Sequence, residues 1–351
     1  MYEYGNARVR AMRSRLLSRH AIESMIARKD LAYVISTLSQ SDYAPDVAEA
    51  LLRYSGPECV EEAARLSVIR AARAIRSFYE PPASDLVAVL LGRYDRHNLV
   101  ACLRGVAARA SVEETAGALF PAGVIREPLL LELAAQPDLR RAVDLMATWR
   151  LPYASAVSTA LWRHGTDSTA PIERAIWQAS VKASLDTLRG RGANVALVRE
   201  LVEREVDVQN LCSLLRLAAV GLSPADVDAA GELISGGARL RPVFTASLGD
   251  VRGVEGLVSR LAGSPYYPWL EAAMPAYRQS GRVATLTRAL ETRLSAWCMA
   301  LGRGDPLGIG VVIGYLAAKE AEVRNLRLIA RLIWLEADRS AVYDELQSVG
   351  A

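Results

Sequence analysis

A motif of an acidic residue, an asparagine and an arginine recurs along this chain at long and similar intervals. Each copy has Asn three positions after the acidic residue, an apolar residue next, and Arg six positions after the Asn. The full copies begin 112 and 115 positions apart, and a partial copy has its Asn 92 positions before the first full one. Self-similarity at a long period is the mark of duplicated structural units, so we expect this chain to be built of repeats. The residues are Asn6 in the partial copy, then Asp95, Asn98 and Arg104, then Asp207, Asn210 and Arg216, then Glu322, Asn325 and Arg331.

A residue that favours a helix start follows each motif at nearly the same distance. Ser111, Ser223 and Asp338 stand thirteen positions after the Asn of their copies, and Ser18 stands twelve after the first Asn. Side-chain oxygens of Ser and Asp accept hydrogen bonds from the free N–H groups at a helix start. Glu114, three positions after Ser111, completes a capping box. Each unit is therefore predicted to be a long helix, a break and a short capped helix.

Two loops follow the short helices at equivalent unit ends. Their sequences are Phe120-Pro-Ala-Gly123 and Ile234-Ser-Gly-Gly237. Two interpretations stay open for them. Either Phe120, Gly123, Gly236 and Gly237 belong to a rim that faces a partner protein, or the two segments are ordinary surface loops.

Helical periodicity dominates the rest of the chain, and no segment alternates like a strand. Apolar residues make up 51% of the sequence, enough for real cores. Helices are expected from Ser84 to about Ala110 and over Leu307–Glu336, which carry motif copies. Another is expected over Leu130–Trp149, broken or bent near Pro137. The predicted fold class is all-α.

Two roles are considered for the motif asparagine. Asn is unfavourable inside an isolated helix because it competes for backbone hydrogen bonds, so its recurrence at matched positions indicates one shared task. That task is either bonding to loop groups of its own unit, which fixes the angle between units, or lining a polar central opening. The motif arginine lies almost two turns from the Asn and need not touch it.

Several functional classes find no support in the sequence. The net charge is only +3 with no run of like charge, so nucleic-acid binding is not expected. Phosphate-binding, metal-binding and serine-nucleophile motifs are missing, so we expect no catalytic site, cofactor or metal. The four cysteines match no disulfide or metal pattern and are interpreted as small buried hydrophobes in a reducing compartment. No signal peptide is recognised, and the longest nearly apolar run, Pro306–Ala318, is too short to span a bilayer.

At this point the motif copies resemble a known family. The segment from Lys319 to Arg331 resembles the signature of the C subunit of V/A-type (vacuolar/archaeal-type) rotary ATPases and ATP synthases, the counterpart of the eukaryotic V-ATPase d subunit. The start of the chain, Tyr4–Arg10, the segment Glu203–Leu211 and the loop Leu233–Gly237 are similar to other blocks of that family. One departure is the stretch Leu332-Ile-Trp334-Leu335, which stands where the family usually has a Gly-Lys turn.

The resemblance implies a fold and a role. The family fold is a funnel of three similar helical domains around a pseudo-threefold axis, here expected at 1–94, 95–206 and 207–321, with 322–351 closing the first. The implied function is that of a non-catalytic rotor subunit in the central stalk. Its socket would receive the shaft made of the D and F subunits, and its base would sit on the proteolipid ring. The shaft in turn connects to the catalytic A/B head. We thus expect a peripheral protein on the cytoplasmic face of a membrane, bound through the ring.

Two other classes of protein were weighed against this resemblance. An unrelated all-helical repeat scaffold or adaptor is one, but its repeats would be about 34–47 residues long, less than half the period seen here. An all-α enzyme acting on diphosphates is the other, and it would need clustered aspartates for Mg²⁺, which the sequence lacks.

Overall fold

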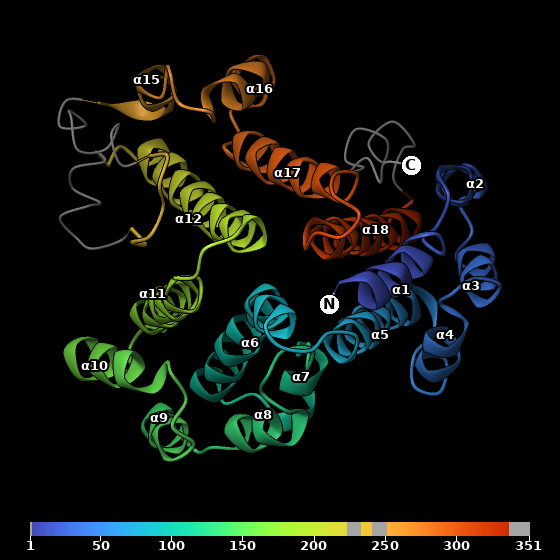
Figure 1. Cartoon of the computed structure of the whole chain (residues 1–351), viewed down its shortest axis with the longest axis horizontal. Helices are drawn as coiled ribbons and strands as arrows, with labels where there is room; N and C mark the ends of the chain where they lie inside the picture. The colour runs from blue at the N-terminus through green and yellow to red at the C-terminus, as the bar shows by residue number, and fades with distance from the viewer. Residues whose placement is uncertain (1, 223–232, 241–250, 337–351) are drawn as a thin grey trace. The chain divides into compact units, whose positions relative to one another are not determined.

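A computed structural model describes residues 2–222, 233–240 and 251–336. All regular secondary structure in this part of the chain is helical, with no strand, which confirms the all-α prediction (Figure 1). The helices are α1 (Glu3–Arg13), α2 (Arg19–Arg28), α3 (Leu31–Ser39), α4 (Ala44–Ala50), α5 (Gly56–Ser77), α6 (Ala83–Ala108), α7 (Val112–Gly117), α8 (Glu127–Ala134), α9 (Leu139–Thr148), α10 (Ala154–His164), α11 (Ala170–Thr187), α12 (Ala193–Ala219), α15 (Gly253–Arg260), α16 (Tyr267–Ser280), α17 (Ala284–Leu301) and α18 (Gly310–Trp334).

The three full motif copies lie on the three longest of these helices, α6, α12 and α18. The capping signals work as expected in the two copies where they are described. Ser18 accepts a hydrogen bond from the Ala21 amide at the start of α2, and Ser111 and Glu114 form a complete capping box on α7. The predicted caps at Ser223 and Asp338 lie outside the described residues.

The predicted break near Pro137 and the predicted helix through Trp334 are both confirmed. The region Leu130–Trp149 forms two helices, α8 and α9, because Asp138 caps a new helix directly after Pro137. The stretch Leu332–Leu335 forms no turn before Trp334: α18 continues through that residue.

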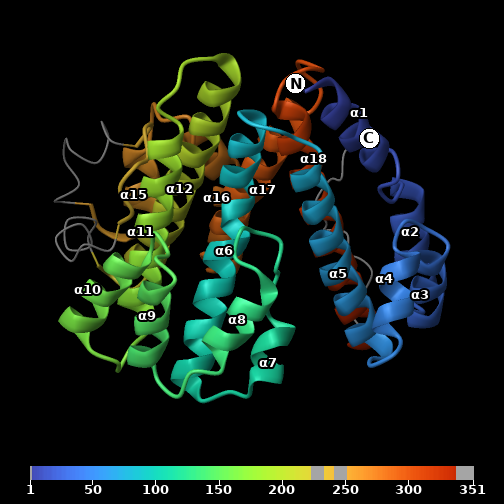
Figure 2. The same cartoon turned by 60° about the horizontal axis from the view of Figure 1, so that its bottom comes forward.

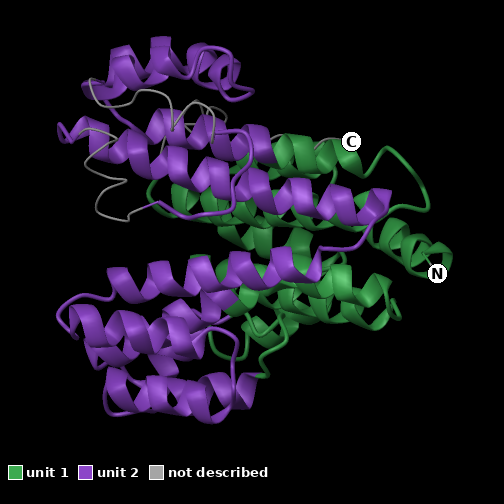
Figure 3. Ribbon diagram, turned by 60° about the vertical axis from the view of Figure 1, so that its left-hand side comes forward, with its two compact units in different colours: residues 1–95, 120–126, 295–351 green, residues 96–119, 127–294 purple. Residues whose placement is uncertain are grey.

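The chain divides into two compact units (Figure 3). Unit 1 consists of residues 1–95, 120–126 and 295–351, and unit 2 consists of residues 96–119 and 127–294. This division follows the density of contacts and does not test the three-part repeat, which stays a prediction.

Helices from both ends of the chain build the core of unit 1. α18 lies beside α5 and α1 and also contacts α2 and α3 (Figures 1 and 2). Leu326, Ile329 and Ala330 of α18 are fully buried in one apolar cluster with Met25, Val34 and other N-terminal residues. The N-terminal helices therefore bury their apolar faces against a helix that comes almost 300 residues later.

Two glycines let α17 and α18 approach closely in unit 1. A Cβ on Gly314 would lie 2.6 Å from the Cα of Gly302, so any larger residue at Gly314 would push the backbones apart. The glycine-rich segment Gly308–Gly314 therefore contributes to a close contact between backbones.

The core of unit 2 includes an apolar cluster on the second half of α12. Leu211, Leu215 and neighbouring residues of α12 pack with Leu257 of α15, Leu270 of α16 and Leu290 of α17. None of the helices within the described ranges is both long enough and apolar enough to cross a bilayer.

Candidate functional site

The acidic residue of every full motif copy is buried. Asp95, Asp207 and Glu322 are 2%, 1% and 0% exposed. Carboxylates are almost never buried to this degree unless hydrogen-bond donors or cations compensate for the lost water. The partners of these three carboxylates therefore reveal what the motif does.

Asp95 holds the loop that contains Gly123. Its carboxylate accepts hydrogen bonds from the backbone amides of Val124 and Ile125, at 2.8 and 2.9 Å. Two arginines of α5 hold the carbonyls of the same loop: Arg73 donates to Pro121 at 3.2 Å and Arg76 to Gly123 at 2.6 Å. The loop is thus fixed through both its amides and its carbonyls.

Asp207 does the same for the loop that contains Gly237. Its carboxylate accepts from the Arg239 amide and from the Tyr266 hydroxyl, both at 3.0 Å. A further backbone bond comes from Leu240. The second copy of the motif therefore ties its own following loop to its own long helix, as the first copy does.

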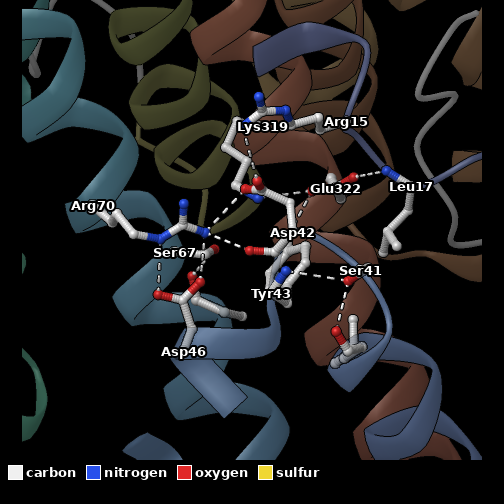
Figure 4. Close-up of polar contacts among 12 residues, drawn as sticks. Arg15, Leu17, Ser41, Asp42, Tyr43, Asp46, Ser67, Arg70, Lys319 and Glu322 are labelled. Carbon is white, nitrogen blue, oxygen red and sulfur yellow. Dashed lines mark hydrogen bonds and ion pairs between the residues drawn. The ribbon is translucent and has the colours of Figure 1, made fainter. Parts of the chain in front are cut away.

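Glu322 ties α18 to the first segment of the chain (Figure 4). The carboxylate accepts a hydrogen bond from the Leu17 amide and another from the Tyr43 hydroxyl at 2.6 Å. Lys319, one turn earlier on α18, donates to the same carboxylate at 2.9 Å. The third copy thus has the same kinds of partner as the second, a loop amide and a tyrosine hydroxyl, but takes them from the opposite end of the chain.

A second set of charges surrounds this cluster. The Lys319 ammonium lies 3.8 Å from the centre of the Tyr43 ring, which is a cation–π contact. Arg70 of α5 binds the Asp46 carboxylate at 2.8 Å and the Asp42 carboxylate at 3.0 Å, on either side of Tyr43 in the sequence (Figure 4). The turn before α4 is thereby held from α5 as well as from α18.

Two of the loop glycines make room for the aspartates. A Cβ on Gly123 would lie 2.2 Å from an Asp95 carboxylate oxygen, and a Cβ on Gly237 would lie 2.0 Å from one of Asp207. The third loop has no glycine before Leu17, and there the motif carries the longer Glu322. The two aspartates thus face a loop glycine, whereas the longer Glu322 faces a loop segment without one.

Two motif asparagines bond backbone groups in loops. Asn210 both donates to the Ile234 carbonyl, at 2.8 Å, and accepts from the Ile234 amide, at 2.9 Å. Asn6 donates to the carbonyls of Pro306 and Gly308 and accepts from the Tyr79 hydroxyl at 2.7 Å. Asn98 and Asn325 are buried too, at 0% and 2% exposure.

The motif arginines lie apart from these clusters, on exposed helix positions. Arg104 pairs with Glu173 of α11 at 2.6 Å, and Arg331 pairs with Glu61 of α5 at 2.6 Å. Arg216 is exposed as well. The three acids, Asn6 and Asn210 therefore bond loops, while two of the arginines link neighbouring helices.

Sequence reasoning missed a repeated tyrosine. Tyr43, Tyr153 and Tyr266 are all buried and all stand immediately before a helix, α4, α10 and α16. The hydroxyls of Tyr43 and Tyr266 bond the acids of their copies. The signal was present: Tyr153 and Tyr266 follow Asp95 and Asp207 by 58 and 59 positions.

Burial changes the proton affinities in these clusters. Desolvation raises the pKa of Asp95 and of Asp207, and the loop amides that bond them oppose part of this effect. Desolvation also raises the pKa of Tyr43, reinforced by the neighbouring Glu322, and lowers the pKa of Lys319, which Glu322 counteracts. The Glu322 carboxylate thus favours the protonated forms of both Tyr43 and Lys319 by raising the pKa of each.

The loop residues considered as a partner-facing rim are placed as follows. Gly123 is buried against Asp95, and Phe120 is half-buried, stacking on Tyr94. Gly236 and Gly237 are half-buried, and Val124 is the exposed member of the first loop at 61%. Partner contact by either loop stays a prediction.

Side chains that could bind a metal ion were compared across the described residues. No group of three or more His, Cys, Asp or Glu side chains suited to a metal ion occurs within residues 2–222, 233–240 and 251–336. All four cysteines are buried and form no disulfide with one another, and burial raises the pKa of Cys102 and of Cys212 to about 12.

Comparison with known proteins finds related sequences over nearly the whole chain. The family model of the ATP synthase (C/AC39) subunit matches residues 5–344. The C subunit of the A-type ATP synthase of Haloferax volcanii is 29% identical over 344 residues, covering 98% of this chain and 97% of the relative. The corresponding C subunit of Methanothermobacter thermautotrophicus is 29% identical and that of Methanocaldococcus jannaschii 26%, each over 94% of this chain and 83% and 82% of the relative. The chain therefore belongs to the ATP synthase (C/AC39) subunit family.

Proposed function

We propose that this chain is a non-catalytic rotor subunit in the central stalk of a V/A-type ATP synthase or ATPase. Its role would be to couple the shaft formed by the D and F subunits to the proteolipid ring in the membrane. It would thereby link ATP turnover in the A/B head to proton or sodium transport. It would sit as a peripheral subunit on the cytoplasmic face, held there through the ring.

The observation that carries this proposal is the family match over residues 5–344, together with relatives named as the C subunit of A-type ATP synthases at nearly full length on both sides. A family match of this extent also disfavours an unrelated helical scaffold, whose similarity to these proteins would have no cause.

The buried clusters give the proposal a physical basis. A subunit that transmits torque must resist shear between its helices and the loops that join them. In the clusters of Asp95, Asp207 and Glu322, the buried carboxylates accept hydrogen bonds from backbone amides of loops. Such charge-assisted hydrogen bonds are about twice as strong as neutral ones. Their recurrence supports a division into three similar units, 1–94 with 322–351, 95–206 and 207–321.

Affinity purification from the organism's own membranes would test the proposal. The tagged chain is purified after mild detergent extraction, and its partners are identified by mass spectrometry. We expect a proteolipid, D- and F-type shaft subunits and the catalytic A and B subunits. Recovery of soluble, unrelated partners alone, with the chain missing from membranes, would refute the assignment.

A functional assay separates coupling from mere attachment. In membranes from cells that lack this chain, ATP hydrolysis by the A/B head should persist while ATP-driven ion transport is lost. Supplying the wild-type chain should restore transport. Full transport without the chain would contradict a coupling role.

A further inference from the structure

A groove lies between α10 and α11 within unit 2. Its volume is about 420 Å³, within the roughly 300–1,000 Å³ typical of small-molecule sites. Its lining includes Ser155, Arg163 and His164 of α10 and Arg174 and Gln178 of α11.

The charge of this lining has one sign. Arg163 and His164 stand on one wall and Arg174 on the other, and none of the lining residues is acidic. This is unusual for the molecule as a whole, where acidic and basic residues are nearly balanced at 39 and 42. A groove with cations on both walls attracts an anion.

Arg163 is the cation that a ligand would engage first. It is exposed, and its guanidinium makes no hydrogen bond or ion pair with the described part of the chain. Arg174 on the facing wall is half-buried and has an interaction of its own, so it would add to the field of the groove without being free. Elsewhere in unit 2, by contrast, Arg104 and Arg278 are paired with Glu173 and Glu255.

The walls of the groove are held in place by other contacts. Glu173, next to Arg174 in the sequence, pairs with Arg104, and Trp177 on α11 stacks with Arg96 at 3.8 Å from the ring centre. Gln178 both accepts from the Ser235 amide, at 2.7 Å, and donates to the Ser235 carbonyl, at 3.3 Å. A preorganised wall loses little conformational entropy when a ligand binds.

We propose that this groove is a binding site for the phosphate group of a small molecule or of a lipid headgroup. A phosphate group carries negative charge and several acceptor oxygens, so it can accept hydrogen bonds from Arg163 while Arg174 on the facing wall adds to the attraction. Arginine binds phosphate with two parallel N–H bonds, and the Ser155 hydroxyl on the same wall is a further donor.

The repeat supplies a matched control residue. Leu161-Trp-Arg-His164 in unit 2 corresponds to Leu51-Leu-Arg-Tyr54 in unit 1, and Arg163 and Arg53 each stand ten positions after the tyrosine that precedes their helix. Both arginines are exposed, but Arg53 is not part of the groove lining. Replacing either one removes the same charge from equivalent sequence positions, in the last turn of α10 for Arg163 and in the turn just after α4 for Arg53.

Calorimetric titration of the full chain with sodium pyrophosphate at low salt tests the proposal. Wild type, Arg163→Ala and Arg53→Ala are compared, and circular dichroism checks that all three fold alike. A second arm measures sedimentation with vesicles of phosphatidylglycerol and of phosphatidylcholine. We expect saturable one-to-one binding that Arg163→Ala weakens about tenfold or more, while Arg53→Ala leaves it within about twofold.

The outcomes separate the two sources of phosphate. Binding of pyrophosphate that depends on Arg163 supports a site for a free phosphate compound. Binding to phosphatidylglycerol vesicles alone, again dependent on Arg163, supports a headgroup site. Equal losses in Arg163→Ala and Arg53→Ala would reveal nonspecific charge attraction and overturn the proposal, as would the lack of binding in both arms. Neither arm involves the rotary complex, so the result does not depend on the proposed function.

Discussion

Replacing Gly123 by alanine should break the first of the three acid–loop contacts. The added Cβ would lie 2.2 Å from one carboxylate oxygen of Asp95 and 2.5 Å from the other, far inside contact distance. The backbone of Gly123 is not left-handed, so the effect comes from space alone. To make room, Asp95 must leave the amides of Val124 and Ile125.

The magnitude follows from these contacts. Hydrogen bonds to a charged group contribute about 1.5–3 kcal/mol each, and overpacking typically costs about 1–3 kcal/mol. Since the loop can shift and keep part of this energy, we expect the free energy of unfolding to fall by about 3 kcal/mol. For a cooperative unit of about 150–250 residues, that corresponds to a decrease in Tm of roughly 6–12 °C.

Urea unfolding of four variants measures this. Gly92→Ala is the matched control on the same helix as Asp95: its Cβ would meet nothing within 4 Å, so it should be neutral or stabilise by about 1 kcal/mol. In an Asp95→Ala background, Gly123→Ala should lose most of its cost, because the clashing carboxylate is gone. A Gly123→Ala protein as stable as wild type, or a cost unchanged by Asp95→Ala, would refute the reasoning.

Three further predictions concern the other motif residues. Asn210→Leu leaves the amide and carbonyl of Ile234 without their hydrogen-bond partner, so it should lower the free energy of unfolding in urea by about 2–4 kcal/mol with partner binding intact. Gln209→Leu on the same helix should lower it little. Lost partner binding at unchanged stability would instead favour a lining role. Lys319→Met leaves Glu322 buried without its cation and should lower the free energy of unfolding by about 3–5 kcal/mol. The double variant Lys319→Met with Glu322→Gln should regain part of that stability. A double variant no more stable than the single one would argue against a buried ion pair. Because burial raises the pKa of Asp207, the folded state binds that proton more tightly than the unfolded state. The stability advantage of wild type over Asp207→Asn should therefore grow as pH falls from about 7 towards the ordinary aspartate value near 4, and an advantage that shrinks over this range would contradict the prediction.

The helices and their local starts could be predicted from the sequence because they depend on neighbours along the chain. The capping box of Ser111 and Glu114 and the long motif helices needed only spacing and residue type. The tyrosines at positions 153 and 266 could also be recognised, because they stand at matched offsets from Asp95 and Asp207. They were missed because a tyrosine before a helix has no capping role of its own to draw notice.

The contacts of the carboxylates could not be predicted. Glu322 bonds the Leu17 amide across 305 positions, and no local pattern indicates which loop a buried acid will meet. The glycines at 123 and 237 could be recognised as unusual, but only the structure reveals that each stands against an aspartate. A glycine needed for a flexible turn and a glycine whose missing Cβ leaves room for a carboxylate cannot be told apart in a sequence.

The dependence of unit 1 on α18 sets a condition on the synthesis of this protein. When the ribosome has released residues 1–95, the helices there lack the surface on which Leu326, Ile329 and Ala330 later pack. At the roughly 5–20 residues per second of translation, about 15–60 s separate the emergence of Leu17 from that of Glu322, its hydrogen-bond partner. Through that interval the first helices carry uncovered apolar faces, which makes them natural clients of chaperones that bind nascent chains.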